Sequence, residues 1–188
     1  MANVNAPNGF VPLRHLTGGV IRASEYAIAN SYAANLASGD LVTLAADGTV
    51  IRGTAGGTAL GVFYGVEYID NDTGDVKFRK VWNTGTTAKA NEPIKAYVYD
   101  DPNITYAVQV NGTFANSAVG ALANVTIGTY NSTYGHSTDE LDYATLATTA
   151  KVLRILRLID IPNNAVGADA DVEVVINLSL YGTQNAGV

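Results

Sequence analysis

The chain of 188 residues contains no cysteine, which excludes disulfide bonds, thiolate metal sites and a cysteine nucleophile. It also has little charge, because only 15% of its residues are Asp, Glu, Lys or Arg, against about 25% in an average soluble protein. Glu and Lys, which favour surface helices, are scarce, whereas Gly, Ala, Thr and Asn are abundant. This composition favours a β-rich protein with many turns, whose weakly charged surface suits contacts with other protein subunits.

Basic residues are few, which argues against nucleic-acid binding. The 17 acidic and 11 basic residues leave a net charge of −6, whereas nucleic-acid binders carry a basic patch that neutralises phosphates. The basic residues that come closest to clustering are Lys77, Arg79 and Lys80, and then Lys151, Arg154 and Arg157. Both groups are sparse and lie in expected strands, so we expect no nucleic-acid partner.

Neither a membrane segment nor a secretion signal is expected. No apolar stretch approaches the roughly 18 residues of a membrane-spanning helix. Residues 1–7 contain neither the basic region nor the apolar region of a signal peptide. We therefore expect no membrane partner.

Signatures of catalysis are missing as well. The two histidines, His15 and His136, lie in glycine-rich stretches that match no known catalytic context. The chain has no G-x-S-x-G elbow, phosphate-binding loop, dinucleotide fingerprint or zinc-ligand spacing. Acidic pairs such as Asp100 and Asp101 could serve as glycosidase carboxylates, but we interpret them as turn residues. The sequence predicts no enzyme, no cofactor and no bound metal.

The acidic run Asp-Asn-Asp-Thr-Gly-Asp of residues 70–75 could be a calcium loop. A helical calcium-binding hand needs an oxygen ligand at its fifth position, Gly at its sixth and Glu at its twelfth. This chain has Gly74, Asp75 and Val81 at those positions. Because the pattern fails three times, we interpret the run as an acidic hairpin turn. Loosely bound calcium is the alternative, since three carboxylates on one loop repel each other.

Short apolar runs, separated by turn residues, follow one another along the chain. The predicted strands are residues 26–29, 41–44, 49–52, 60–69, 76–82, 93–99, 104–110, 152–161 and 171–180. Asp47 and Gly48 predict a hairpin turn of type I′, and residues 117–124 could form one short helix. The sequence therefore predicts a mainly β fold of barrel or sandwich modules with little helix.

Composition divides the chain into three parts. Residues 1–20 are broken by Pro and Gly and predict an extended N-terminal arm. The small residues 83–90 predict a linker, which gives one β-rich module over residues 21–85 and a second over residues 86–188. One continuous domain that covers both modules is the alternative.

The arm carries apolar side chains that a disordered segment would not need. Phe10, Leu13 and Leu16 lie beside Arg14 and His15, whose side chains can bind carbonyls or carboxylates. The arm is expected either to pack on its own domain or to contact a capsid protein or a sister subunit through these five residues.

Tyrosine is abundant, with eleven in the chain. Tyr64 and Tyr68 are expected on one face of the strand at residues 60–69. Tyr97, Tyr99 and Tyr106 are candidates for a trimer interface, because tyrosine buries area and keeps a hydrogen bond. The alternative is that they are ordinary half-buried strand residues.

Several segments carry a resemblance to a known family. They are Asn5-Ala6-Pro7-Asn8-Gly9-Phe10 with Pro12-Leu13-Arg14-His15-Leu16, Ala96-Tyr97-Val98-Tyr99-Asp100-Asp101-Pro102 with Tyr106-Ala107-Val108-Gln109, and Leu153-Arg154-Ile155-Leu156 with Pro162-Asn163-Asn164 and Ala186-Gly187-Val188. In this order and spacing they resemble the capsid decoration (cement, or head-stabilising) proteins of tailed bacteriophages, over nearly the whole chain. Residues 39–42, 47–50 and 60–62 are similar to the small β-rich decoration proteins of lambda-like phages.

The resemblance implies a structural protein of the virion. Such a protein is assembled in the host cytoplasm, binds the major capsid protein on the outer capsid surface and stabilises the shell by bridging capsomers. Proteins of this kind typically form homotrimers at three-fold positions, and the family implies no catalytic residues.

Two other classes of function make distinct predictions. A carbohydrate-binding β module, on the virion or in a tail or fibre component, would use surface tyrosines as sugar platforms and show an exposed aromatic row beside an acidic or Asn-lined groove. A phage hydrolase domain would show a deep pocket with convergent acidic residues.

Overall fold

Strands make up almost all of the regular structure in the computed structural model, which describes residues 3–182. The strands are β1 (Val11–His15), β2 (Ser24–Ala27), β3 (Leu36–Ala37), β4 (Leu41–Leu44), β5 (Val50–Arg52), β6 (Gly61–Ile69), β7 (Val76–Arg79), β8 (Val81–Trp82), β9 (Lys95–Tyr99), β10 (Ile104–Asn111), β11 (Thr113–Phe114), β12 (Leu122–Thr126), β13 (Tyr130–Asn131), β14 (His136–Ser137), β15 (Glu140–Ala147), β16 (Leu153–Leu158), β17 (Gly167–Ala168) and β18 (Asp171–Ile176). One 3-10 turn, η1, spans Asn116–Ala118. The predicted mainly β fold is confirmed. Residues 186–188, which belong to the family resemblance, lie outside the described residues.

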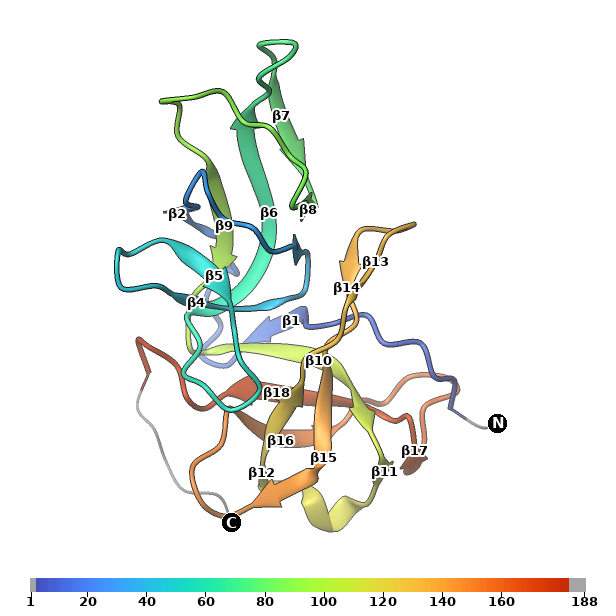
Figure 1. The fold of residues 1–188 in the computed structure, drawn as a ribbon. Coiled ribbons are helices and arrows are strands. Elements are labelled where there is room, and N and C mark those ends of the chain that lie inside the picture. Colours follow the sequence, from blue (N-terminus) through green and yellow to red (C-terminus); the bar gives the residue numbers. More distant parts are fainter. Residues whose placement is uncertain (1–2, 183–188) are drawn as a thin grey trace.

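Five strands of the second half of the chain close a β-barrel (Figure 1). Their order is β10-β15-β12-β16-β18, and β18 pairs back to β10. The pair β10–β15 is parallel, and the other four pairs are antiparallel. Apolar side chains such as Val172, Val174 and Ile176 of β18 fill the interior, because side chains two apart on a strand share a face.

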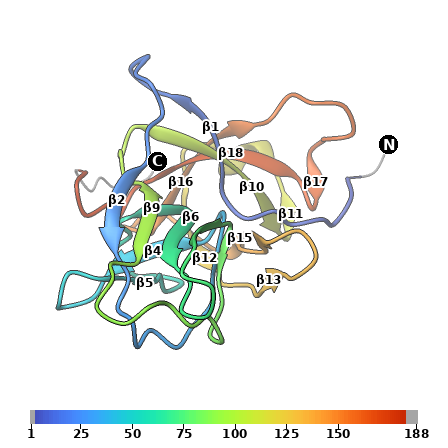
Figure 2. The ribbon, with the colours of Figure 1, turned by 90° about the horizontal axis from the view of Figure 1, so that it is seen from above.

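A second sheet lies above the barrel in Figure 1 and overlies part of it when seen from above in Figure 2. Its order is β2-β9-β6-β4-β5, and β7 also pairs with β6. One face covers a separate apolar core that contains Phe63 and Trp82. The rings of Tyr68 and Trp82 meet edge to face, with centroids 5.7 Å apart, which is a favoured aromatic geometry.

The chain crosses from the upper sheet to the barrel at residues 100–103, between β9 and β10. The linker predicted at residues 83–90 instead joins β8 to β9. Both of these strands come before residues 100–103 along the chain, so the linker does not separate the two parts. Residues 86–99 were expected in the second module, but β9 pairs with β2 and β6 of the upper sheet. The predicted boundary at residues 83–90 is therefore wrong, and the boundary lies at residues 100–103. The composition misled because small residues also suit a loop inside one module. Isolated bridges such as Ser38–His136 and Ala59–Ser179 tie the upper part to the barrel side.

The expected helix at residues 117–124 does not form. The 3-10 turn η1 ends at Ala118, and β12 begins at Leu122. Gly120 lies between them with φ of 86°, and its N–H donates to the carbonyl of Ile155 at 2.9 Å. A left-handed residue cannot continue a right-handed helix, so this segment turns into the barrel instead.

The turn between β4 and β5 differs from the type I′ geometry predicted for it. Only Gly48 has a positive φ there, at 80°, whereas a type I′ turn needs positive φ at both central residues. The N–H of Gly48 donates to the carbonyl of Ala45, and Asp47 Oδ1 accepts from the N–H and the hydroxyl of Thr49. Glycine at the left-handed position completes the turn.

We expect Gly48→Val to lower the free energy of unfolding by about 1–2 kcal/mol through backbone strain alone. A Cβ at this position would meet no other atom within 4 Å, so steric overlap adds nothing. Urea unfolding measures the effect. Gly85→Val is the control, because a Cβ there also meets open space and the backbone of Gly85 is not in the left-handed region. Equal effects of the two substitutions would contradict the assignment.

Candidate functional site

The N-terminal arm packs against its own chain rather than standing free. Strand β1 pairs antiparallel with β10 of the barrel, and the N–H of Ala6 donates to Gln109 Oε1 at 2.9 Å. Phe10 is only 2% exposed and meets the ring of Tyr106 edge to face, with centroids 6.2 Å apart. Phe10 therefore cannot contact another subunit, and the prediction is corrected at this residue because its ring belongs to the barrel core.

The side chains of two further arm residues bind carboxylates of the same chain. Arg14 Nε donates to Glu173 Oε1 at 2.7 Å, and His15 Nε2 lies 2.9 Å from Asp101 Oδ2. Hydrogen bonds from neighbouring residues hold the pKa of Asp101 below its ordinary value, with the N–H of Asn103 the largest contributor and His15 the next. Both pairs help to fix β1 in place, and the side chain of Arg14 remains 49% exposed.

Glu173 of β18 binds arginine side chains from two other strands, β1 and β16. Its side chain is fully buried, and besides Arg14 it accepts a hydrogen bond from Arg157 Nε at 2.5 Å. Burial alone would raise the pKa of Glu173, but hydrogen bonds from neighbouring side chains, Arg14 and Arg157 among them, outweigh it and hold the pKa below its ordinary value. The carboxylate therefore stays charged between two guanidinium groups.

The side chain of Leu13 remains 43% exposed and lines an open groove beside β1. This β1 groove has a volume of about 370 Å³ and is lined by Ala6, Asn8, Gly9, Val11, Leu13, Ala107, Val108, Gln109, Ile159, Ile161 and Asp171. Val11 and Ile161 are exposed as well. Among these lining residues Asp171 is the one with a charged side chain, so the groove offers a partner mainly apolar surface. Leu16, the fifth predicted contact, is exposed just beyond the end of β1.

The three tyrosines predicted at a trimer interface separate into two groups. Tyr106 is fully buried, and its hydroxyl donates to the carbonyl of Tyr99 at 3.2 Å. Burial raises its pKa. It is therefore part of the core and cannot contact another subunit, which corrects the prediction. Tyr97 and Tyr99 are half-buried on β9.

Four aromatic rings form a continuous row on the upper sheet. In order they are Tyr99, Tyr64, Phe78 and Tyr97, with neighbouring centroids 5.4, 6.0 and 5.5 Å apart. Tyr64 and Phe78 are 44% and 53% exposed. Sequence reasoning placed Tyr64 on the same face as Tyr68, but a β-bulge between Phe63 and Gly65 turns Tyr64 outward. We call this set the aromatic row.

A larger cleft lies at the Tyr99 end of the aromatic row. This junction cleft has a volume of about 860 Å³ and is lined by Ala6, Pro7, Asn8, Phe10, Val11, Pro12, Ser38, Gly39, Phe63, Tyr64, Lys80, Tyr99, Asn131, Tyr134, His136 and Thr138. The ring of Tyr134 stacks on that of His136, with centroids 5.9 Å apart and planes 8° apart. The volume of the junction cleft is within the range of about 300–1,000 Å³ typical of ligand sites.

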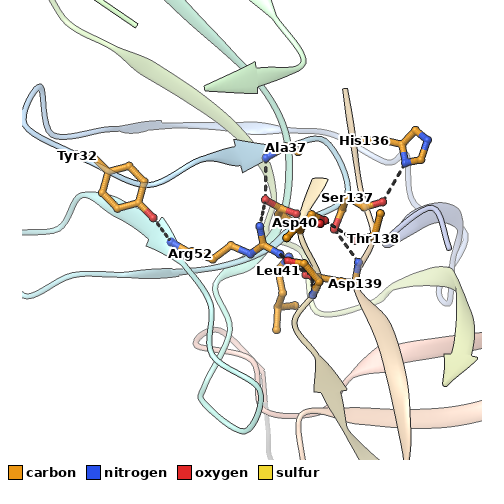
Figure 3. A network of polar contacts seen from close by, with 11 residues as sticks. Tyr32, Ala37, Asp40, Leu41, Arg52, His136, Ser137, Thr138 and Asp139 are labelled. Carbon is orange, nitrogen blue, oxygen red and sulfur yellow. Dashed lines mark hydrogen bonds and ion pairs between the residues drawn. The ribbon is translucent and has the colours of Figure 1, made fainter. Parts of the chain in front are cut away.

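A buried charge network connects the upper sheet with the barrel side (Figure 3). Arg52 of β5 donates from Nη1 to Asp40 and from Nη2 to Asp139 Oδ1, the latter at 2.5 Å. Both carboxylates are fully buried. Burial raises the pKa of Asp40 to about 6 and also raises that of Asp139, while the charge of Arg52 acts in the opposite direction on both. The network is structural, because it is buried between the two parts of the molecule.

The acidic run at residues 70–75 forms the turn of the β6–β7 hairpin, as predicted. Asp70 Oδ1 accepts hydrogen bonds from the N–H groups of Asp72 and Thr73, and Lys77 Nζ lies 2.6 Å from Asp70 Oδ2. The hydrogen bond from Lys77 is the main cause of a lowered pKa of Asp70. The carboxylate of Asp70 is therefore engaged in hydrogen bonds within the turn.

Within residues 3–182 no group of three His, Asp or Glu side chains is placed to hold a metal ion. In the same residues no helix is long and apolar enough to cross a membrane.

No protein-family model, no curated protein and no solved structure matches the chain.

Proposed function

We propose that this chain is a capsid decoration protein of a tailed bacteriophage, which binds the major capsid protein on the outside of the shell and bridges capsomers. One observation supports the proposal most strongly: segments that resemble such proteins, though far apart in the chain, come together around the β1 groove. Residues 12–16 lie largely in β1, and residues 106–109 lie in β10, which pairs with it. The groove is lined by Ala6, Asn8 and Gly9 of residues 5–10 and by Ala107, Val108 and Gln109 of residues 106–109.

The chemistry of the groove suits a protein partner. Apolar side chains removed from water contribute about 25 cal/mol per Å² of buried area, and a groove that is nearly free of charge has little desolvation cost to offset that gain. The pairs Arg14–Glu173 and His15–Asp101 hold β1 rigidly, so little ordering entropy is lost on binding.

Stabilisation of the shell would follow from mass action, since a ligand of the intact shell favours the intact state. We propose that the protein acts as a homotrimer, in which three copies around one axis present three grooves at once. Linked weak contacts bind far more tightly than single ones. Light scattering on the purified protein tests this part of the proposal, and a strict monomer in solution and on the particle contradicts it.

The double substitution Leu13→Asp with Ile161→Asp is expected to weaken capsid binding at least about tenfold, which corresponds to about 1.4 kcal/mol. Charges placed in the groove would have to be desolvated against the capsid protein. Co-sedimentation of the purified protein with capsids that lack it measures the affinity.

Val76→Asp is the matched control, because Val76 is an exposed valine of β7 that does not line the groove. It should bind capsids like the unmodified protein. The groove assignment is wrong if the double variant pellets with capsids as well as the control does, and the proposed function fails if the unmodified protein shows no saturable binding.

A further inference from the structure

We propose that the aromatic row and the junction cleft together bind an acidic glycan, a chain of sugar rings that carries carboxylate or sulfate groups. This would be a second binding activity, independent of capsid attachment through the β1 groove.

The aromatic row offers faces on which sugar rings can stack. The faces of aromatic rings are electron-rich, so they attract the polarised C–H groups on the apolar side of a sugar. A Cβ at Gly65 would lie 3.0 Å from the ring of Phe78, so the glycine lets this ring lie against the sheet. Tyr97 is held by a hydrogen bond of 2.9 Å from its hydroxyl to Glu67 Oε2. The rings are therefore prepositioned on paired strands, which lowers the entropy cost of binding.

The junction cleft supplies hydrogen-bonding groups where the row ends. Asn8, Asn131 and Thr138 line it beside Tyr64 and Tyr99, and amide and hydroxyl groups both donate and accept hydrogen bonds. Sugar hydroxyls do the same. A site lined mainly by apolar and aromatic side chains, with a few convergent polar groups, is typical of small-ligand binding.

The charge of the junction cleft favours an anionic ligand. The chain has a net charge of −6, yet the lining of the cleft includes Lys80 and His136 and no carboxylate. Nδ1 of His136 lies 2.9 Å from the carbonyl of Ser137 and donates to it, which leaves Nε2 as the second polar atom of the ring. A carboxylate or sulfate group of a sugar would find the ammonium group of Lys80 as a cationic partner here.

The opposite end of the row makes a second protein subunit a poorer occupant. Beyond Tyr97, Lys95 Nζ lies 3.6 Å from Glu25 and 3.7 Å from Glu67. A protein that covered the row would have to desolvate these charges, which often costs as much as their pairing returns. Sugar hydroxyls can instead hydrogen-bond to them at the open surface.

The test is binding of the fluorescently labelled full-length protein to an array of neutral and acidic oligosaccharides, which includes uronate and sulfated hexamers. Titration of the best acidic hexamer then follows. We expect acidic chains to bind, and Tyr64→Ala with Phe78→Ala to weaken binding about tenfold or more, which corresponds to about 1.4 kcal/mol, because the double variant removes two of the four stacking faces. Lys80→Gln should weaken the acidic hexamer several-fold.

Matched controls are Tyr181→Ala, an exposed tyrosine outside the row, and Lys89→Gln, an exposed lysine outside the cleft. Both should bind like the unmodified protein. The proposal is overturned if no acidic glycan on the array binds, if binding survives loss of Tyr64 and Phe78, or if neutral chains bind equally well. It is also overturned if the double alanine variant changes the oligomer mass in light scattering, because the row would then be a subunit interface.

Discussion

Replacement of Arg52 by Met should lower the free energy of unfolding by about 3–5 kcal/mol near neutral pH, as expected when one partner of a buried ion pair is removed. Arg52 is the cation between Asp40 and Asp139, and both of these carboxylates are fully buried. Without it, two negative charges would remain inside the protein with no cation to balance them. Urea unfolding followed by circular dichroism measures the loss.

The effect of this substitution should depend on pH in a defined direction. The pKa of Asp40 is raised from 3.8 to about 6 in the folded protein. Between those values the folded protein binds more protons than the unfolded chain, so this group's contribution to stability falls as pH rises. Removal of Arg52 raises both pKa values further, and the defect should therefore be smaller at about pH 4.5 than at about pH 7.5.

Arg22→Met is the matched control, because Arg22 is an exposed arginine of the same upper part of the molecule. A change within about 0.5 kcal/mol is expected for it, as is usual at surface positions. If Arg52→Met lowers the free energy of unfolding as little as Arg22→Met does, or if its effect is larger at acidic pH, the network does not contribute to stability as proposed.

The second large effect is expected for Phe10→Ala, which should cost about 3–5 kcal/mol, the usual range for removal of a buried phenylalanine ring. The cost arises because the ring fills the barrel core against Tyr106. For a chain of this length the midpoint of thermal unfolding should fall by roughly 10 °C. Differential scanning calorimetry measures it.

Leu16→Ala, a substitution in the same arm at an exposed residue, is the control and should cost less than about 1 kcal/mol. Similar effects of the two substitutions would mean that the arm is not anchored by Phe10. The comparison separates an arm that belongs to its own domain from one that only rests on it.

The strands were largely predictable from sequence because alternating apolar residues carry a local signal. The strand predicted at residues 41–44 forms with those bounds, and the one predicted at residues 104–110 runs one residue further. The strand predicted at residues 171–180 begins at Asp171 but ends at Ile176. Strand β15 was missed, because in Glu140–Ala147 only Leu141 is fully buried and its pattern shows no alternation.

Features that depend on distant pairings could not be predicted. The bulge that exposes Tyr64 arises from the register between β6 and β9, and it decides which face the ring occupies. Phe10 and Tyr106 were expected at interfaces, yet they meet each other in the core because β1 pairs with β10. Arg52 and Asp139 are 87 residues apart in the sequence, and the residues around each of them give no sign that the two side chains will pair. The sequence identifies the apolar and aromatic residues, but the pairing of the strands decides which of their side chains remain exposed at the surface.

The most direct test of the account is an electron cryomicroscopy reconstruction of capsids decorated with the purified protein. We predict density for the chain on the outer surface of the shell, with Val11, Leu13 and Ile161 of the β1 groove facing the major capsid protein. Capsids incubated with the Leu13→Asp, Ile161→Asp variant should lack that density. Bare capsids at saturating protein would contradict the proposed function, and a bound chain whose β1 groove faces solvent would contradict the proposed docking surface.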